Sequence, residues 1–263
     1  MCKKVLICSG KGGVGKTTVA ANLSLALCAA GYKVIAADCD YTLNNLEIAF
    51  NLENTVKYGI ADCLSGRVFL GGALYPVAKH LRNNPNGGSL FLLSSHGCPF
   101  EKSELSETLS LCSKLADYII IDSRAGQTEE LDTVASIATD AIIVTTPHIA
   151  AIRDADKVAA TLDRYELDSV SLAVNRVRAD HIENSKAPAP SEISSLIRVP
   201  LSATLPEDDE INLSATVSPF VKSRSQEAYK MFALLTANGS GEVYQCETAR
   251  KSGIMSRFKE LFN

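Results

Sequence analysis

Short apolar runs recur along the chain, separated by stretches in which apolar residues return at helical spacing. The runs are mostly apolar throughout, as strands covered on both faces are. They are KVLICS (4–9), KVIAAD (33–38), LFLLSS (90–95), DYIIID (117–122), DAIIVTT (140–146), SVSLAVN (169–175) and RVPLSATL (198–205). Strands alternating with helices predict right-handed βαβ crossovers, and hence an α/β fold: a doubly wound, mostly parallel sheet with helices on both faces.

The polar stretches set the expected boundaries of this fold. Residues 75–88 (YPVAKHLRNNPNGG) are rich in Pro, Asn and Gly and predict a surface loop. The stretch from 238 to 252 is polar and lacks periodicity, which predicts a flexible linker. We therefore expect one domain over residues 1–237, a linker over 238–252 and a C-terminal amphipathic helix over 253–263.

Composition and charge narrow the classes of function. The 263 residues are 46% hydrophobic and 21% charged, which is ordinary for a globular protein. A formal net charge of −4 and a pI near 5.6 argue against a surface built for nucleic acid, so any basic function must be local. The apolar runs are too short to span a bilayer, and the eight cysteines include no C-x-x-C pair. We expect a cytosolic protein with reduced thiols.

The segment after the first predicted strand carries the strongest chemical signal. It reads GKGGVGKTT and satisfies G-x-x-x-x-G-K-[ST] between a strand and a helix. Glycines let backbone N–H groups surround phosphate oxygens, and the helix N-terminus adds partial positive charge. Lys16 is expected to reach the β- and γ-phosphates of ATP, and Thr17 to ligate Mg²⁺. The predicted nucleotide-binding residues are Gly10, Lys11, Gly12, Gly13, Val14, Gly15, Lys16, Thr17 and Thr18.

Lys11 places a second lysine at the start of this loop. With it, KGGVGKT resembles the deviant Walker A motif of the MinD/ParA family of P-loop ATPases, and the chain is closest to the MinD branch. In that family the first lysine crosses a dimer interface to the partner's nucleotide. The resemblance therefore implies a homodimer formed around two ATP molecules, with Lys11 and Lys16 among the catalytic residues.

Two further segments extend the resemblance. DCDYTLNNLEIAF (38–50) is similar to the family's first switch region, which implies that Asp38 lies near Mg²⁺ and that Asp40 orients the attacking water. YIIIDSRAG (118–126) is similar to the Walker B strand and second switch region, which makes Asp122 the Mg²⁺-linked carboxylate. These roles suit phosphoryl transfer, where the protein positions metal and water. MinD-like proteins usually carry Pro where this chain has Arg124.

Family-like segments near the end of the domain imply the base site. In AVNRV, Asn175 matches the adenine-contacting asparagine, whose amide can donate to and accept from the base edge. Arg176 either stacks on the base or stays in solvent. The residues expected on the other side of the base are Pro206, Glu207 and Asp208 of LPEDDEI.

Other members of this fold suggest three alternative functions. An iron–sulfur electron-transfer ATPase, like nitrogenase reductase, needs two thiolates per subunit; beyond Cys98 the second switch offers none, so no cluster is expected. A ParA-like DNA-partition ATPase needs a basic stripe, and KSRSQEAYK (222–230) is equally well explained as a solvated helix face, so DNA is not expected as a partner. A FlhG-like flagellar-number ATPase usually has an N-terminal extension that engages a GTPase, whereas the first strand here begins by Lys3.

The last thirteen residues, KSGIMSRFKELFN, interleave bulky apolar side chains with basic ones. On a helix the apolar residues form one stripe, which is the composition of a helix lying in a membrane interface with cations on anionic head groups. It also resembles the membrane-targeting sequence of MinD, and the alternative is a last helix docked on the core. The predicted membrane-contacting residues are Ile254, Met255, Arg257, Phe258, Lys259, Leu261 and Phe262.

The family resemblance implies a function for the whole chain. We expect an Mg²⁺-dependent ATPase that dimerises with ATP, binds the inner face of the cell membrane through its C-terminal helix, and positions the division site. A MinC-like inhibitor and a MinE-like activator are the candidate protein partners, and anionic lipid is the candidate surface. The FlhG-like and ParA-like roles remain the alternatives.

Overall fold

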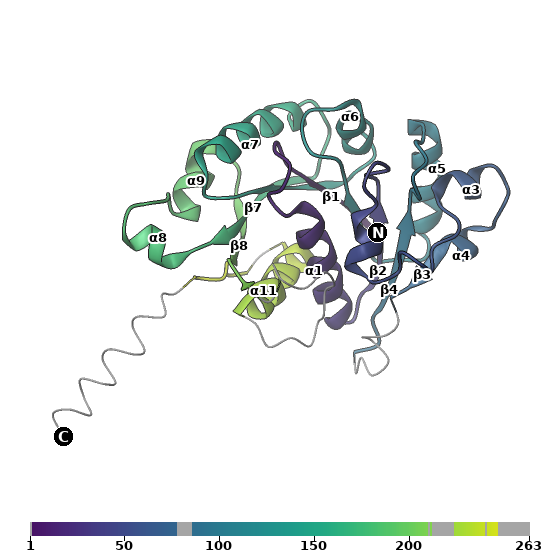
Figure 1. Ribbon diagram of the computed structural model, residues 1–263, viewed down its shortest axis with the longest axis horizontal. Coiled ribbons are helices and arrows are strands. Elements are labelled where there is room, and N and C mark those ends of the chain that lie inside the picture. Colours follow the sequence, from purple (N-terminus) through teal and green to yellow (C-terminus); the bar gives the residue numbers. More distant parts are fainter. Residues whose placement is uncertain (1, 78–85, 210, 212–223, 240, 247–263) are drawn as a thin grey trace, which may run out of the picture.

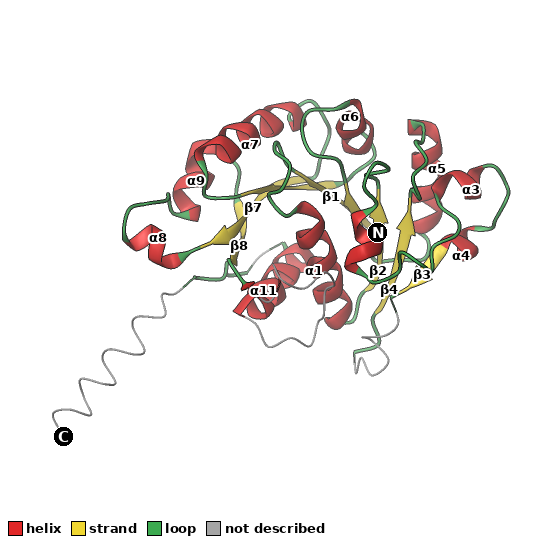
Figure 2. Ribbon diagram, viewed as in Figure 1, coloured by secondary structure: helices red, strands yellow, loops and turns green. Residues whose placement is uncertain are grey.

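The computed structural model describes residues 2–77, 86–209, 211, 224–239 and 241–246. Within them, eight strands form one sheet in the order β3-β4-β2-β5-β1-β6-β7-β8, and every neighbouring pair is parallel except β3 and β4 (Figures 1 and 2). The strands are β1 (Lys3–Cys8), β2 (Lys33–Asp38), β3 (Leu74–Pro76), β4 (Ser89–Ser94), β5 (Tyr118–Asp122), β6 (Asp140–Thr145), β7 (Ser169–Val177) and β8 (Leu201–Pro206). The predicted fold class, a doubly wound and mostly parallel sheet, is confirmed.

Helices cover both faces of the sheet, as Figure 2 shows. One face carries α1 (Lys16–Ala29), α2 (Asn45–Ala49) and α11 (Arg224–Asn238). The opposite face carries α3 (Ile60–Leu64), α4 (Leu70–Ala73), α5 (Lys102–Cys112), α6 (Glu129–Ala135), α7 (Ile149–Leu162) and α9 (Pro190–Ile197). The short helix α8 (Ala179–Glu183) follows β7 and has no fully buried residue.

The pleat of the central strand explains why its sequence is apolar at every position. In β1, Leu6 and Cys8 belong to the core beneath α5, α6 and α7, whereas Val5 and Ile7 belong to the core beneath α1 and α11. All four are at most 1% exposed. Because successive side chains point to opposite faces, a strand buried on both sides needs no polar alternation.

Two boundaries differ from the expectation. Strand β3 lies partly inside residues 75–88, which were predicted to be a loop; it has only three residues and its Pro76 is tolerated because β3 is an edge strand. Residues 241–246 of the predicted linker have no regular structure, yet Tyr244 packs partly buried against the α1–α11 core. The Sγ atom of Cys246 lies 3.8 Å from the Val177 carbonyl oxygen. This part of the linker therefore contacts the domain.

The predicted C-terminal helix over residues 253–263 lies outside the described residues, so its structure stays a prediction. None of the described helices combines the length and apolar character that crossing a bilayer requires.

Candidate nucleotide-binding site

The loop between β1 and α1 has the backbone that a phosphate cradle needs. Gly13 and Gly15 have φ angles of 79° and 94°, a region that side chains with a Cβ rarely adopt. At Gly10 the constraint is space, since a Cβ there would lie 2.1 Å from the backbone oxygen of Asp154 on α7. Val14 is 4% exposed and anchors the loop in the core. A Cβ added at Gly12 or Gly13 would meet nothing within 4 Å, so this part of the loop borders open space just before α1.

The two lysines of the loop have different surroundings. Lys11 is exposed, at the outer edge of the site. Lys16 is half-buried, and its charge is close enough to Asp122 to lower the pKa of that carboxyl against the effect of burial. Lys16 thus lies near the predicted metal-site carboxylate, while Lys11 is accessible to another molecule.

Three predicted metal-site residues lie together at the carboxyl ends of adjacent strands. Asp38 ends β2 and Asp122 ends β5, and the two are register partners. The Thr17 hydroxyl donates a 2.6 Å hydrogen bond to Asp122 Oδ2. The other carboxylate oxygen of Asp122 is buried and has no hydrogen-bond partner within the described part of the chain. A buried carboxylate oxygen without a donor fits a hard cation or its water ligands.

Burial also perturbs the titration of both carboxyls. Burial raises the pKa of Asp122 to about 6, the Thr17 hydrogen bond and Lys16 working in the opposite direction. The pKa of Asp38 is raised well above its ordinary value, first by burial and then by the charge of Asp122. Two buried carboxylates side by side destabilise each other when ionised, and a cation between them would relieve this repulsion.

The residues present fit a magnesium ion that is shared with a nucleotide. Among the described residues, no group of three or more His, Cys, Asp and Glu side chains could hold a metal alone. Mg²⁺ is commonly held by one or two protein oxygens together with phosphates and water. Thr17 and Asp122 would therefore hold it directly or through water, with Asp38 beside them.

Replacing Asp122 with Asn should stabilise the protein in the absence of nucleotide. Burial raises the pKa of the Asp122 carboxyl from 3.8 to about 6 in the folded protein. The protonated carboxyl therefore stabilises the folded state at low pH, and this stabilisation is lost as the pH rises through 6. We expect Asp122→Asn to raise the free energy of unfolding by about 1–3 kcal/mol near pH 8 and by little near pH 4. Urea unfolding at both pH values measures the difference.

The control is Asp156→Asn, because Asp156 is exposed on α7. This variant should leave the free energy of unfolding unchanged at both pH values. Lower stability of Asp122→Asn near pH 8, or an equal gain at both pH values, would contradict the proposed cost of the buried charge.

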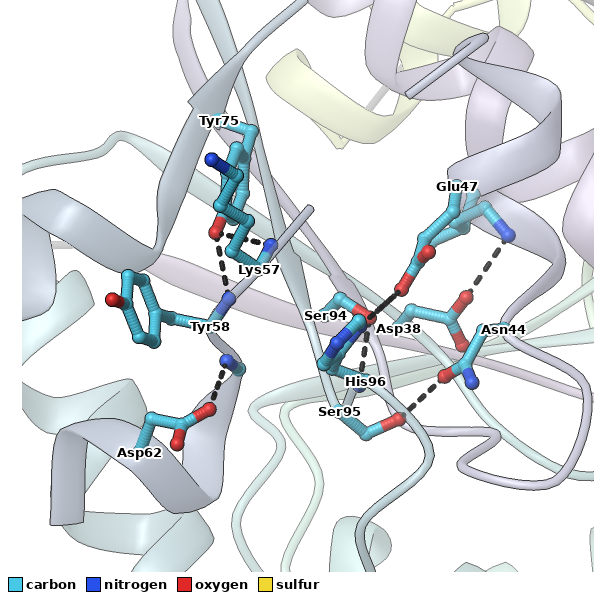
Figure 3. Close-up of polar contacts among 12 residues, drawn as sticks. Asp38, Asn44, Glu47, Lys57, Tyr58, Asp62, Tyr75, Ser94, Ser95 and His96 are labelled. Carbon is cyan, nitrogen blue, oxygen red and sulfur yellow. Dashed lines mark hydrogen bonds and ion pairs between the residues drawn. The ribbon is translucent and has the colours of Figure 1, made fainter. Parts of the chain in front are cut away.

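The first switch region is held by Asp38 and by the end of β4. Asp38 accepts hydrogen bonds from the backbone N–H groups of Asp40 (3.1 Å) and Leu46 (2.9 Å). Figure 3 shows Asn44 and Glu47 turned towards the last residue of β4 and the two residues after it. The side-chain distances are 2.9 Å from Ser95 Oγ to Asn44 Oδ1, 2.5 Å from Ser94 Oγ to Glu47 Oε1 and 3.6 Å from His96 Nδ1 to the same Glu47 oxygen.

Asp40 lies at the open side of this region. Its carboxylate accepts bonds from Thr42, at 2.5 Å from Oγ1 and 3.3 Å from the backbone nitrogen. Its own carbonyl oxygen accepts from the N–H groups of Leu43 and Asn44. Asp40 is half-buried, so its carboxylate is held by a local turn while remaining accessible to water.

The second switch region runs against the phosphate loop. The Gly126 N–H donates to the Ser9 carbonyl oxygen at 2.8 Å, and the Ser123 hydroxyl donates to the Ile7 carbonyl oxygen at 3.0 Å. These bonds fix the chain that follows Asp122 beside the start of the loop. Arg124, between them, is exposed.

A hollow beside the loop contains most of the residues predicted for the base. Asn175 Nδ2 donates to the Val14 carbonyl oxygen at 2.8 Å, so one donor of its amide holds the loop. Arg176 has a φ of 55° at a register shift between β7 and β8, and its side chain is exposed. The hollow is lined by Gly15, Thr18, Asn175, Arg176, Leu205, Pro206, Asp208, Ile211, Ser225 and Tyr229.

Two differences from the predicted base site follow from this lining. Glu207 is not among the described lining residues; its N–H continues the pairing with β7 by donating to the Val177 carbonyl oxygen at 3.0 Å. Ser225 and Tyr229 of α11 were not anticipated, because no local pattern indicates where α11 docks. The Ser225 hydroxyl is buried without a hydrogen-bond partner among the described groups, which suits it to a polar edge of a base.

The predicted membrane-contacting residues, from Ile254 to Phe262, lie outside the described residues. The structure therefore describes the residues predicted for phosphate, metal and base but not the predicted membrane segment.

Comparisons with known proteins agree with this geometry. The family model of the CobQ/CobB/MinD/ParA nucleotide-binding domain matches residues 5–219. The septum site-determining protein MinD of Bacillus subtilis is 31% identical over 271 residues, which cover 100% of this chain and 98% of that protein.

Solved structures of MinD have the same fold. A MinC:MinD complex of Aquifex aeolicus is similar with a TM-score of 0.81 and 28% identity, over 93% of this chain and 99% of that one. MinD of Pyrococcus horikoshii complexed with Mg-ADP is similar with a TM-score of 0.76 and 28% identity, over 97% and 98% of the two chains. The chain belongs to the MinD/ParA family of nucleotide-binding proteins, and within it to the MinD septum site-determining ATPases.

Proposed function

We propose that this chain hydrolyses ATP to ADP and phosphate with Mg²⁺, and that ATP switches it between a monomer and a membrane-binding dimer that positions the division site. The observation that carries the proposal is the arrangement of Thr17, Asp38 and Asp122 beside the phosphate loop. The unsatisfied buried oxygen of Asp122 supports a metal–nucleotide ligand. Family members with this loop are ATPases.

Each residue of the site has a separate role in the proposed reaction. The loop N–H groups and Lys16 bind the phosphates, while Thr17 and Asp122 hold the metal, which supplies positive charge to the phosphate oxygens. Asp40 orients the attacking water, as its accessible carboxylate allows. Asn175, Pro206 and Asp208, together with Ser225, form the walls of the base site. Lys11, exposed at the edge, reaches the nucleotide of a partner subunit.

The membrane part of the proposal rests on the sequence of the C-terminal segment. One short amphipathic helix binds a bilayer weakly, because it must fold as it inserts. Two such helices on one dimer can raise avidity by about 10²–10⁴-fold, since the second insertion is intramolecular. ATP would thereby control membrane binding through dimerisation, without touching lipid itself.

We also propose that the ATP-bound dimer recruits a MinC-like inhibitor and is released by a MinE-like activator. The Aquifex MinC:MinD complex, a relative of the same fold, supports the first of these partners. Septum position, flagellar number and plasmid retention in cells without this protein would separate the division role from the FlhG-like and ParA-like alternatives.

Dimerisation gives the proposal a direct test in solution. With a non-hydrolysable ATP analogue, light scattering should show the mass of the unchanged protein doubling from 28.1 kDa, and with ADP it should stay at that value. Lys11→Ala should bind the analogue but remain monomeric, because its loss removes the charge offered to the partner's nucleotide. An exposed lysine elsewhere, changed as Lys114→Ala, should dimerise normally. Dimers of Lys11→Ala, or monomers of the unchanged protein with the analogue, would contradict the proposal.

A further inference from the structure

One carboxylate joins the two switch regions. Tyr41, directly after Asp40, donates its hydroxyl to Glu130 Oε1 on α6 at 2.8 Å. Arg124, two residues beyond Asp122, has its Nη1 atom 3.6 Å from the same oxygen. Glu130 therefore contacts a residue next to the proposed water-orienting carboxylate and a residue two positions after the proposed metal-linked one. We name this contact, made by Tyr41, Arg124 and Glu130, the switch bridge.

The tyrosine of the switch bridge is held at its ring as well as at its hydroxyl. Its ring packs edge-on against Phe100, with centroids 6.3 Å apart and an interplanar angle of 84°. The hydrogen bond to Glu130 raises the pKa of Tyr41. The pKa of Glu130 is lowered, first by its own backbone N–H and then by the Tyr41 hydroxyl. Both shifts favour a neutral tyrosine bonded to an ionised carboxylate, which is the stronger kind of hydrogen bond.

The arginine contributes less to the bridge. Its side chain is 46% exposed and that of Glu130 is 21% exposed, so water and salt screen the ion pair. The tyrosine hydrogen bond is shorter, and Tyr41 is half-buried whereas Arg124 is exposed. Tyr41 and Glu130 therefore form the main link, and Arg124 adds a weaker one.

The bridge acts on a turn that is also held to Asp38 and, farther along, to the end of β4. Thr42 donates two hydrogen bonds to the Asp40 carboxylate, and Tyr41 lies between these two residues in the same turn. Asn44 and Glu47 attach the later part of the region to the end of β4. The Tyr41 hydroxyl supplies the attachment on the α6 side. With both attachments in place, the position of the Asp40 carboxylate is set before reaction.

We propose that Tyr41 and Glu130 are positioning residues for ATP hydrolysis, holding Asp40 in its water-orienting position and coupling that position to the second switch region. This role rests on the proposed ATPase function. Tyr41 and Glu130 are not expected to contact ATP, since the phosphate loop and base hollow are built from other residues. Their removal should consequently change turnover and leave nucleotide affinity in place.

Steady-state ATPase kinetics test the proposal through the split between kcat and KM. Tyr41→Phe, which removes only the hydroxyl, should lower kcat about 3–10-fold with KM changed less than about 2-fold. Glu130→Ala should lower kcat at least as much, and Arg124→Gln by no more than about 2-fold. The double variant of Tyr41→Phe and Glu130→Ala should be no slower than Glu130→Ala alone, because both changes remove one interaction.

Tyr165→Phe is the matched control, since the Tyr165 hydroxyl donates to Asp132 at 2.6 Å, also on α6 but outside the switch regions. It should leave kcat and KM unchanged. An unchanged or increased kcat for Tyr41→Phe, or multiplicative losses in the double variant, would overturn the proposal.

Hydrogen exchange gives a second readout that does not depend on turnover. The N–H groups of Leu43 and Asn44 bond to Asp40, and their exchange should accelerate in Tyr41→Phe but not in Tyr165→Phe. Equal exchange in both variants would show that the bridge does not hold the turn. Absence of ATP hydrolysis by the unchanged protein would instead contradict the proposed function, and with it this role for the bridge.

Discussion

Lys16→Ala is expected to remove ATP hydrolysis and to weaken ATP binding by about 10²-fold or more. The structure places Lys16 at the first residue of α1, half-buried and electrostatically coupled to Asp122. There the ammonium group would meet the phosphate oxygens of a bound nucleotide in a partly desolvated site, where charge-assisted hydrogen bonds are strongest. Titration calorimetry with ATP and a phosphate-release assay measure the two effects.

Lys114→Ala controls for the loss of a lysine, because Lys114 is exposed after α5 and far along the chain from the loop. It should bind and hydrolyse ATP normally. A Lys16→Ala protein that keeps ATP affinity within about 3-fold of the unchanged chain would show that the loop does not hold the phosphates as proposed.

Asp40→Ala is expected to lower kcat by about 10²–10⁴-fold while ATP binding persists. Its carboxylate is held by Thr42 and remains accessible, whereas the residues proposed to bind phosphate and base lie elsewhere in the site. Loss of this group should therefore stop the chemical step after the nucleotide has bound. The protein should accumulate as an ATP-bound dimer and stay longer on membranes. Single-turnover hydrolysis and dissociation from supported bilayers measure the two consequences.

The control for Asp40→Ala is Asp163→Ala, an exposed aspartate at the end of α7 that should have no effect on either readout. Rapid release of Asp40→Ala from the membrane with ATP would show that another group orients the water.

The main features of the fold and of the phosphate site were predictable because they are local or follow from a periodic pattern. The phosphate loop is nine consecutive residues between a strand and a helix, and the glycines at 13 and 15 have the left-handed backbone that their motif predicts. Asp38 and Asp122 are far apart in sequence, but each ends a buried parallel strand. The rule that such ends share one edge of the sheet brings them together, and β2 and β5 are neighbours.

The contacts that were not predictable depend on how separate elements dock. Ser225 and Tyr229 reach the base hollow because α11 packs across β8 and α1. The sequence around these two residues carries no pattern that predicts this packing. Glu130 similarly meets Tyr41 through the placement of α6 beside the first switch region. The edge strand β3 was missed because three residues ending in proline resemble a turn more than a strand.

Arg124 departs from the family pattern, and the contacts that it makes depend on how the chain folds. From the sequence it was visible only as an arginine where related proteins usually have proline. In the structure its guanidinium lies beside Glu130, and the neighbouring Gly126 keeps its bond to the phosphate loop. The second switch region thus accommodates the arginine at its exposed side, and Asp122, the proposed metal ligand, is bonded to Thr17.

The proposed membrane switch links the described site to the C-terminal segment outside it. In this proposal ATP binding creates the dimer, the dimer presents the two C-terminal segments predicted to be amphipathic helices, and hydrolysis separates them again. Each step has a distinct variant: we expect Lys16→Ala to block nucleotide binding, Lys11→Ala to block pairing and Asp40→Ala to block release. Together the variants would assign any failure of membrane binding to a single step.

Co-sedimentation with vesicles of anionic lipid tests the central claim most directly. We predict that the intact protein pellets with vesicles in ATP, stays in the supernatant in ADP, and stays there in either nucleotide when the chain ends before Lys251. The shortened chain should still hydrolyse ATP, because the described site lies wholly before that residue. An intact protein that remains in the supernatant with ATP, or a shortened chain that pellets as well as the intact one, would contradict an ATP-controlled membrane anchor.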